Sequence, residues 1–281
     1  METLSSILSI PIRIISTVLS LPIILFGSLY DLFFKKLPDE PHTILVTGAS
    51  SGICREVAIQ YAKPGVTLFL VARNVERLNA TAEIIRAKGA TVFVASIDAT
   101  DEEKMRKYIQ EQDAKYKLDL VIAGVGIVTP ANACSMKLSD LFDLIINTNI
   151  NSCKNAVLPV IDSFRERRHG QICILSSVAG LGMNFISPMY SSTKMANFAF
   201  GEAKVMSSSS VHALSIRCFR ESRLSWYTSN IKYESLGYTD TPILDTNTGK
   251  NASYILKVED VAATIIDGLK HDYSVIECNM V

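Results

Sequence analysis

Residues 43–54 read Thr-Ile-Leu-Val-Thr-Gly-Ala-Ser-Ser-Gly-Ile-Cys. The stretch begins with residues of high β propensity, continues into a turn with two glycines, and is followed by a helical pattern over residues 55–63. Glycines let a backbone approach a phosphate, and the free N–H groups and positive end of the next helix attract one. The stretch therefore predicts a nucleotide-binding unit of strand, turn and helix.

The same alternation continues along the chain. Asp98 and Gly126 follow two of the predicted strands, at positions where a nucleotide crevice is expected. Strands and helices that alternate at this spacing are typical of the α/β class, with a parallel, doubly wound sheet. Strands are predicted at residues 66–71, 91–96, 118–123, 172–175, 213–217 and 273–278, and helices at residues 75–88, 101–116, 190–204 and 258–270.

Arg73 follows the second predicted strand. An acidic residue at such a strand end binds the ribose hydroxyls of NAD, whereas an arginine can accept the 2'-phosphate of NADP. Arg73 therefore indicates NADP. The alternative is an arginine that only caps a surface turn.

A second motif is Tyr-Ser-Ser-Thr-Lys at residues 190–194. In a helix, Tyr190 and Lys194 lie one turn apart on the same face, and a neighbouring ammonium favours the phenolate form of a tyrosine. Ser177, at the end of the predicted strand 172–175, could hold a substrate oxygen beside that phenol. These residues predict a site for proton transfer. The alternative is an ordinary amphipathic helix with an exposed lysine.

Taken together, these motifs resemble those of the short-chain dehydrogenase/reductase family over nearly all of residues 42–281. The resemblance implies a Rossmann fold, with Tyr190 as general acid/base and Lys194 as the residue that favours its phenolate and binds the nicotinamide ribose. It implies that Ser177 positions the carbonyl and that Asn149, in preference to Asn147 or Asn151, links the lysine to solvent. The implied cofactor-binding residues are Thr47, Gly48, Ser50, Ser51, Gly52, Ile53, Arg73, Asp98, Gly126, Tyr190, Lys194 and Thr241.

The chain departs from the family pattern at four places. Cys54 replaces the last glycine of the cofactor turn, where a larger side chain is expected to disturb packing, and Gly124 replaces an asparagine that braces the sheet. The helix after Asn149 is about three residues short of the family's length. An insertion, Cys218 to Ser235, separates a strand from the turn that normally follows it. It could be a substrate-side lid, a partner surface, or sequence retained by altered splicing.

Residues 4–34 form a strongly apolar segment with 17 uncharged residues from Ile14 to Tyr30. This length fits a tilted membrane span or a shallow hairpin, and a soluble helical hairpin is the alternative. A signal peptide fits less well, because no basic region precedes the apolar run. Lys35 and Lys36 favour a cytoplasmic position for the domain that follows. We therefore expect an anchor and linker at residues 1–37, a catalytic domain at residues 38–281, and the endoplasmic reticulum or a lipid droplet as the location.

Composition limits the partners and cofactors. The chain has 28 basic and 28 acidic residues and no basic block, so nucleic acid is not expected as a partner. The four histidines lack metal-ligand spacing, so no metal site is expected. The six scattered cysteines are expected to be buried thiols of a reducing compartment.

The sequence thus predicts an NADP-dependent oxidoreductase that acts on a lipophilic carbonyl or alcohol. The apolar residues that precede Tyr190 suggest a lipophilic carbonyl, and the family resemblance implies ketosphinganine, steroid, retinoid or acyl-chain carbonyls as candidates. By resemblance, we expect a homodimer through the helices that carry Asn149 and Tyr190. One alternative is a catalytically weakened nucleotide-binding or scaffold protein at a membrane. Another is a product that does not fold stably because of the insertion and the shortened helix.

Overall fold

The computed structural model describes residues 37–130, 132–181, 187–202, 212–218, 238–239, 255–271 and 275–278. The chain divides into two units, Met1–Pro38 and Asp39–Val281, and the fold described here is that of the second. The apolar segment at residues 4–34, Thr241 and nearly all of the insertion lie outside the described residues. Among the described helices, none has the length and apolar character that a membrane crossing requires.

A parallel sheet forms the centre of the domain, with the strand order β3-β2-β1-β4-β5-β6-β9. Every pair of neighbouring strands is parallel, so the predicted doubly wound α/β sheet is confirmed. The strands are β1 (Thr43–Thr47), β2 (Thr67–Ala72), β3 (Thr91–Ser96), β4 (Leu120–Ala123), β5 (Gln171–Leu175), β6 (His212–Cys218) and β9 (Val275–Cys278). A separate parallel pair joins β7 (Tyr238–Thr239) to β8 (Ile255–Leu256).

The strand order reverses between β1 and β4. From β1 the chain proceeds outward to β2 and β3 and then crosses back to β4, next to β1. In register, Thr47 at the end of β1 lies opposite Ala123 at the end of β4. Open parallel sheets bind ligands beyond the carboxyl ends of the strands at this kind of reversal.

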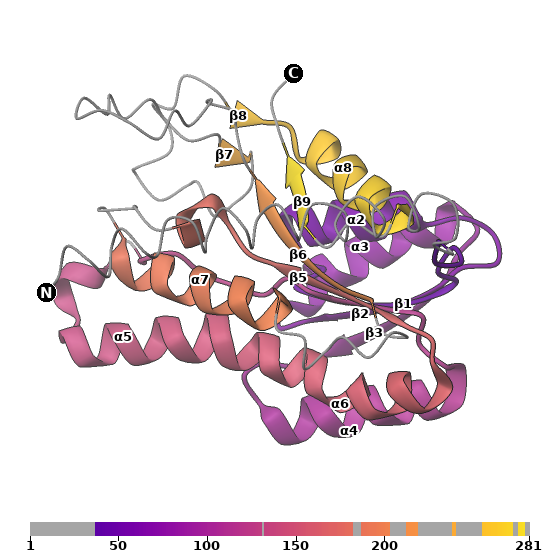
Figure 1. Ribbon diagram of the computed structural model, residues 1–281, viewed down its shortest axis with the longest axis horizontal. Coiled ribbons are helices and arrows are strands. Elements are labelled where there is room, and N and C mark those ends of the chain that lie inside the picture. Colours follow the sequence, from indigo (N-terminus) through magenta and orange to yellow (C-terminus); the bar gives the residue numbers. More distant parts are fainter. Residues whose placement is uncertain are drawn as a thin grey trace, which may run out of the picture. The chain divides into compact units, whose positions relative to one another are not determined.

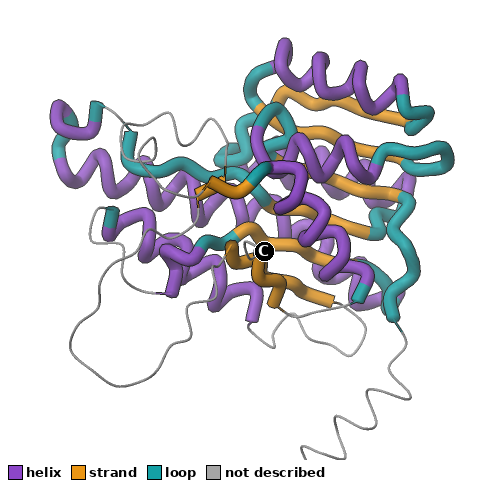
Figure 2. The backbone as a smooth tube through the Cα atoms, turned by 90° about the horizontal axis from the view of Figure 1, so that it is seen from above, coloured by secondary structure: helices purple, strands orange, loops and turns teal. Residues whose placement is uncertain are grey.

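Helices cover both faces of the sheet (Figures 1 and 2). Figure 1 shows α2, α3 and α8 on one side and α4, α5, α6 and α7 on the other. The helices are α2 (Gly52–Tyr61), α3 (Val75–Ala87), α4 (Glu102–Tyr116), α5 (Leu138–Ile146), α6 (Ser152–Arg167), α7 (Pro188–Glu202) and α8 (Val258–Lys270), with short helical turns at Ala133–Ser135 and Val178–Leu181.

Successive strand residues point to opposite faces and fill two apolar cores. In β1, Ile44 and Val46 join the core under α2, α3 and α8, while Leu45 joins the core under α4 and α6. In β2, Leu70 joins the first of these cores and Phe69 joins the second. Each such side chain, when fully buried, stabilises the fold by about 1.5–3 kcal/mol. Burial on both faces explains why these strands are continuously apolar in sequence.

A single helical path joins α5 to α6. Between them, Asn147–Asn151 forms a π-helical turn, so the shortened helix noted in the sequence does not interrupt the path. A π turn frees a backbone carbonyl and is frequent at functional sites. It places Asn149 in the interior of the protein, with no exposed surface.

The cysteines differ in part from the prediction. Cys54, Cys153 and Cys173 are buried free thiols, as expected, whereas Cys134 is exposed. Cys134 lies in the turn Ala133–Ser135, which has no buried residue. Burial had been predicted for all six cysteines, and the prediction is wrong for Cys134 because this turn does not pack into either core.

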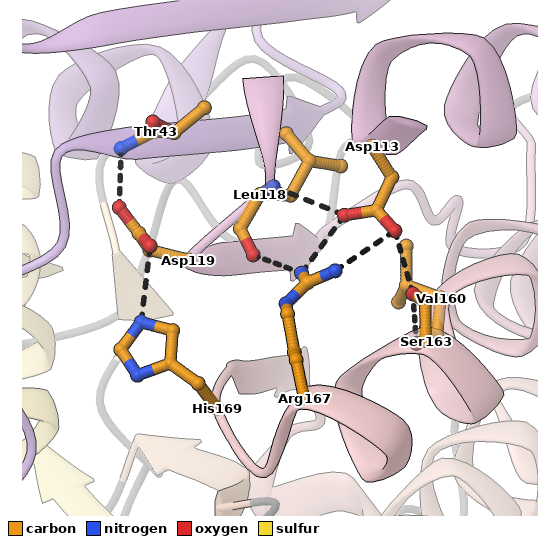
Figure 3. A network of polar contacts seen from close by, with 8 residues as sticks. All are labelled: Thr43, Asp113, Leu118, Asp119, Val160, Ser163, Arg167 and His169. Atoms are coloured by element: carbon orange, nitrogen blue, oxygen red, sulfur yellow. Dashed lines mark hydrogen bonds and ion pairs between the residues drawn. The ribbon is translucent and has the colours of Figure 1, made fainter. Parts of the chain in front are cut away.

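A polar network fixes the amino-terminal ends of β1 and β4 (Figure 3). Asp119 accepts hydrogen bonds from the backbone N–H groups of His42 and Thr43, at 2.9 and 2.8 Å. Its other carboxylate oxygen lies 3.0 Å from Nε2 of His169. One side chain therefore ties the start of β1 to the end of α6, at the edge of the sheet opposite the expected crevice.

Beside Asp119, Asp113 of α4 and Arg167 of α6 form a buried ion pair. Two Arg167 nitrogens donate to the two carboxylate oxygens at 3.0 and 2.8 Å. Ser163 also donates to Asp113, at 2.6 Å, and the backbone N–H of Leu118 donates at 3.0 Å. Burial opposes ionisation of Asp113, but the hydrogen bonds from Arg167 and Ser163 outweigh it and hold the pKa of the carboxyl below its usual value.

Candidate active site

The glycine turn after β1 has the backbone that phosphate binding requires. Gly48 and Gly52 have φ values of +76° and +59°, in the left-handed region that favours glycine. Ser51, the N-cap of α2, makes no side-chain capping bond, and no acidic residue lies in the first turn of this described helix. The positive end of α2 is therefore available to an anion. Ser50 and Ile53 lie in the same partly exposed segment.

Thr47 connects this turn to β4. Its Oγ1 donates to the carbonyl of Ile122 at 3.2 Å and accepts from the N–H of Gly124 at 3.2 Å. On the other side, the N–H of Gly48 donates to the carbonyl of Val71 at 2.8 Å. The turn is thus held to both strands that flank β1.

Arg73 and Asp98 meet at the ends of β2 and β3. An Arg73 nitrogen lies 3.7 Å from an Asp98 carboxylate oxygen, and 71% and 45% of the two side chains are exposed. Asp98 also accepts two hydrogen bonds from Thr100. An exposed ion pair contributes little to stability, so Arg73 can turn to another anion at small cost.

Lys194 lies between the end of β5 and Gly126. It is 5% exposed, and its Nζ donates to the carbonyl of Leu175 at 2.9 Å. A Cβ built on Gly126 would be 3.2 Å from that Nζ, so only glycine leaves the lysine this position without displacement. The same Nζ lies 5.7 Å from the centre of the Tyr190 ring, one helical turn earlier. The spacing of the two residues in the sequence therefore does place them together.

The segment after β5 packs closely on α7 at Lys194. Ser176 donates from Oγ to the backbone carbonyl of Lys194 at 2.6 Å. A Cβ on Gly180 would lie 2.7 Å from the carbonyl carbon of Lys194, so the two backbones are in close contact. Ser177, between them, is half-buried and accepts from the N–H of Ala179 at 3.3 Å. The predicted serine thus lies in the segment that contacts the lysine.

Asn149 joins three parts of the site through its side-chain amide. Its Oδ1 accepts from the N–H of Ile127 at 2.7 Å, and its Nδ2 donates to the Ile127 carbonyl and to Thr193 Oγ1, both at 2.9 Å. A Cβ on Gly126 would also be 3.4 Å from Oδ1. By contrast, Asn147 and Asn151 bond to each other at the exposed surface. Among these three residues, Asn149 is the one that lies at the lysine.

Two buried thiols lie close enough to Lys194 to feel its charge. Burial raises the pKa values of Cys54 and Cys153 to about 12, although the Lys194 ammonium acts in the opposite direction. Both thiols are therefore protonated at neutral pH. Neither cysteine is therefore a candidate for proton transfer, because a protonated buried thiol is a poor base and nucleophile.

The family model for short chain dehydrogenases matches residues 42–211. This match covers more than half of the chain and includes the glycine turn and the site around Lys194. The chain belongs to the short-chain dehydrogenase family. Its cofactor turn, the strands β1 to β5 of its sheet and its Tyr190–Lys194 pair lie in the part of the chain that carries the match.

Several curated members of the family are similar to this short-chain dehydrogenase. An uncharacterized oxidoreductase of Listeria monocytogenes is 34% identical over 154 residues, which are 54% of this chain and 62% of the relative. Retinol dehydrogenase 8 of Bos taurus is 30% identical over 59% of this chain and 54% of its own length. A 3-oxoacyl-[acyl-carrier-protein] reductase of Staphylococcus aureus is 32% identical over 53% and 61%. The chain spans less than two thirds of the length of these relatives.

Solved structures with the same fold align over most of the chain. A short-chain dehydrogenase from Sphingobium yanoikuyae, in complex with NADPH, has a TM-score of 0.70 at 21% identity and aligns over 86% of this chain and 87% of its own. A short-chain dehydrogenase from Mycobacterium paratuberculosis, bound to NAD, has a TM-score of 0.65 at 20% identity, over 84% and 95%. At this identity the likeness establishes the fold.

Several residues that shape the site were not predicted from the sequence. Asn197 donates from Nδ2 to the backbone carbonyl of Asn149 at 3.0 Å, and it is 3% exposed. Thr129 and Ser187 share a hydrogen bond of 2.6 Å that joins the segment after β4 to the start of α7. Asn197 had a readable signal, because a polar residue three positions after Lys194 lies near the same helix face. The hydrogen bond between Thr129 and Ser187 had no signal in the sequence.

Proposed function

We propose that this short-chain dehydrogenase is an NADP(H)-dependent oxidoreductase that transfers a hydride between nicotinamide and a lipophilic carbonyl or alcohol. The observation that carries the proposal is the position of Lys194. It lies beside the Tyr190 ring, Gly126 and Leu175, at the end of the sheet that also holds the glycine turn. A buried ammonium beside a phenol, next to a nucleotide crevice, suits carbonyl reduction.

The residues around the site fit a dinucleotide. The left-handed glycines and the uncapped start of α2 suit its pyrophosphate, and Arg73 suits a 2'-phosphate. The bound nicotinamide would supply or accept the hydride. Asp98 and Gly126 lie along the same ends of the strands, and Thr241 is proposed as a further contact from the sequence alone.

The protein's own groups account for the proton and for the charge on oxygen. Tyr190 gives a proton to the substrate oxygen during reduction and removes it during oxidation. Ser177 and the phenol stabilise the oxyanion by hydrogen bonds. Lys194 favours the phenolate that remains, and Asn149 holds the π turn against the loop at Ile127. The buried position of Lys194 strengthens its electrostatic effect, because little water screens it.

A lipophilic substrate is supported by the sequence and by two relatives. Residues 4–34 are strongly apolar, and apolar residues precede Tyr190. The relatives named above include a retinol dehydrogenase and a 3-oxoacyl reductase. We therefore propose retinoid, acyl-chain, steroid or ketosphinganine carbonyls as the substrate class. A turnover screen over these four classes, following NADPH absorbance, selects among them.

We also propose that residues 4–34 attach the chain to a membrane of the endoplasmic reticulum or a lipid droplet, with the catalytic domain in the cytoplasm. The support is the apolar segment and the two lysines after it. We expect the chain to resist extraction from membranes by alkali. We also expect protease added to intact organelles to digest the catalytic domain. Release by alkali would contradict attachment through this segment.

The central test is the Tyr190→Phe variant. General acid–base catalysis typically contributes about 10²–10⁴-fold, so we expect turnover to fall by at least about 100-fold. NADPH affinity should change little, because the ring remains. Turnover and fluorescence titration of NADPH measure the two effects separately.

Tyr108→Phe on α4 is the matched control, because it removes a phenol hydroxyl from a helix that carries none of the proposed site residues. Its turnover should equal that of the wild type. Unchanged turnover in Tyr190→Phe would contradict the proposed mechanism. A cooperative melt that neither NADPH nor NADH shifts would instead favour the scaffold alternative, because a ligand of the folded state must raise the melting temperature.

A further inference from the structure

We propose that Cys54 and Gly124 form a matched pair that holds the cofactor turn in place relative to Lys194. This inference rests on the proposed function, because it assigns Cys54 as a positioning residue for the nucleotide crevice. Cys54 lies in the first turn of α2, two residues after Gly52, and Gly124 directly follows β4.

The thiol of Cys54 occupies the space that a side chain at residue 124 would need. A Cβ built on Gly124 would lie 1.9 Å from Sγ of Cys54 and 2.8 Å from Cδ1 of Leu175. Non-bonded heavy atoms attract best at about 3.5–4.0 Å, so neither contact is tolerable without movement. With the thiol of Cys54 and the side chain of Leu175 in these positions, only glycine fits at residue 124.

The same thiol fills the gap that this glycine would leave. Cys54 is 4% exposed, and it belongs to the apolar core between α2 and the sheet. The N–H of Gly124 donates to Oγ1 of Thr47, the residue at which the cofactor turn begins. Gly124 is therefore in contact with both ends of that turn, through Thr47 and through Cys54.

The contact continues to the lysine through Leu175. The side chain of Leu175 packs at the same point, and its carbonyl accepts the hydrogen bond from Lys194 Nζ. A shift of Cys54 or Gly124 would move Leu175 and, with it, the acceptor of the lysine. The two departures from the family pattern thus compensate each other, although each alone is expected to weaken the site.

The test is a double-substitution cycle on the full-length chain, with Cys54→Ala, Gly124→Ala and the double variant. Dissociation constants for NADPH are measured well below the melting temperature of every variant, so that they report the crevice and not unfolding. Overpacking should weaken NADPH binding by the Gly124→Ala variant by about tenfold or more. Cys54→Ala leaves a small cavity under the cofactor turn, so it should weaken NADPH binding by about threefold, which is less than the loss in Gly124→Ala. The double variant should bind more tightly than Gly124→Ala, because the second substitution removes the clash.

Gly180→Ala provides the control. Its Cβ would meet the backbone of Lys194 at 2.7 Å, and the nearest atoms to it all belong to Lys194 and Met195, so Cys54→Ala should not restore NADPH binding. Should Gly124→Ala not fold, recovery of a folded, NADPH-binding chain in the double variant gives the same answer.

The outcomes separate the inference from the proposed function. If the wild-type chain fails to bind NADPH, the proposed function is overturned and the positioning role with it. If the wild type binds NADPH but Gly124→Ala binds it equally well, only the pairing is overturned. The pairing is also overturned if the fold loss of NADPH affinity in the double variant equals the product of the fold losses in the two single variants.

Discussion

Lys194 is held in position by the protein itself. Its Nζ bonds to the Leu175 carbonyl, Ser176 bonds to its backbone carbonyl, and Gly180 packs against the same peptide. A side chain that is already ordered loses little entropy when a ligand binds, so the lysine is preorganised. The preorganisation of Lys194 therefore depends only on its immediate contacts with Leu175, Ser176 and Gly180.

Arg73 allows a prediction about cofactor choice. We expect Arg73→Ala to weaken NADPH binding by about tenfold or more and to leave NADH binding nearly unchanged, because only NADPH carries the 2'-phosphate. The loss of its exposed pair with Asp98 should have little effect on stability. Parallel titrations with the two cofactors measure the ratio.

Arg77→Ala is the matched control, because it removes the same charge from an exposed position four residues later. It should leave both affinities unchanged. An equal loss of NADPH and NADH affinity in Arg73→Ala would show that Arg73 contacts a part that the two cofactors share.

At the residue scale, the sequence was informative where spacing determines geometry. Tyr190 and Lys194 lie together because residues four apart share a helix face. The acceptor for Lys194 could not be predicted, because it is the backbone carbonyl of Leu175 and any residue type would provide it. In the sequence, Cys54 and Gly124 looked like two separate departures from the family pattern. Their packing against each other could not be predicted, because the two residues belong to different elements.

At the scale of elements, the π turn Asn147–Asn151 joins α5 to α6 and is supported from two sides. Asn197 donates to the Asn149 carbonyl, and the Asn149 amide bonds to the loop at Ile127. The freed backbone group and the amide both have partners, so the turn does not leave a buried polar group without a hydrogen bond at this residue. The sequence indicated a short helix but could not show how the path continues.

The ion pair of Asp113 with Arg167 joins α4 to α6 and predicts a pH dependence (Figure 3). Arg167→Met leaves the buried carboxylate with Ser163 and the Leu118 N–H as donors, so we expect a loss of about 3 kcal/mol in the free energy of unfolding at pH 7. The folded pKa of Asp113 lies below its unfolded value of about 4. The stabilisation is therefore complete above that value and is lost as the pH falls through the folded pKa.

Denaturant unfolding of the wild type and the variant at pH 7, 5 and 3 measures this difference. The gap between the two proteins should be constant from pH 7 to 5 and should narrow at pH 3. Arg165→Met, which removes a surface pair at 3.7 Å from the same helix, should cost less than about 1 kcal/mol. A gap that widens in acid would mean that Asp113 is not the group that titrates.

At the scale of the whole domain, exposed apolar side chains gather on the helices that carry the site. Phe142 of α5, Leu158 of α6 and Met195 of α7 are 45–49% exposed, and Leu138 is 71% exposed. A second copy of the chain would remove such surface from water. We propose a homodimer through α5, α6 and α7.

Leu158→Glu should convert this dimer to a monomer, because it places a charge in the buried part of the contact. Light scattering after size-exclusion chromatography measures the mass. Ile84→Glu is the control, since Ile84 is 38% exposed on α3, which covers the other face of the sheet. A wild-type monomer, or a dimer in both variants, would contradict the proposed contact.

The architecture of the domain was the most predictable feature. Alternating strands and helices specify a parallel sheet, and the predicted bounds agree with β3 and α8 and differ by a few residues elsewhere. The predicted burial of Cys134 was wrong, because the residue lies in a short turn that has no buried residue. The insertion after Cys218 has no periodic pattern to read, and it lies almost wholly outside the described residues.

The exclusion between Cys54 and Gly124 also constrains which substitutions this chain can accept. The family pattern has glycine at the first position and asparagine at the second, and this chain has cysteine and glycine. A chain with cysteine and asparagine together would place two side chains in one volume. Asparagine at residue 124 would therefore require a smaller residue at position 54, so a variant that restores the asparagine must change position 54 first.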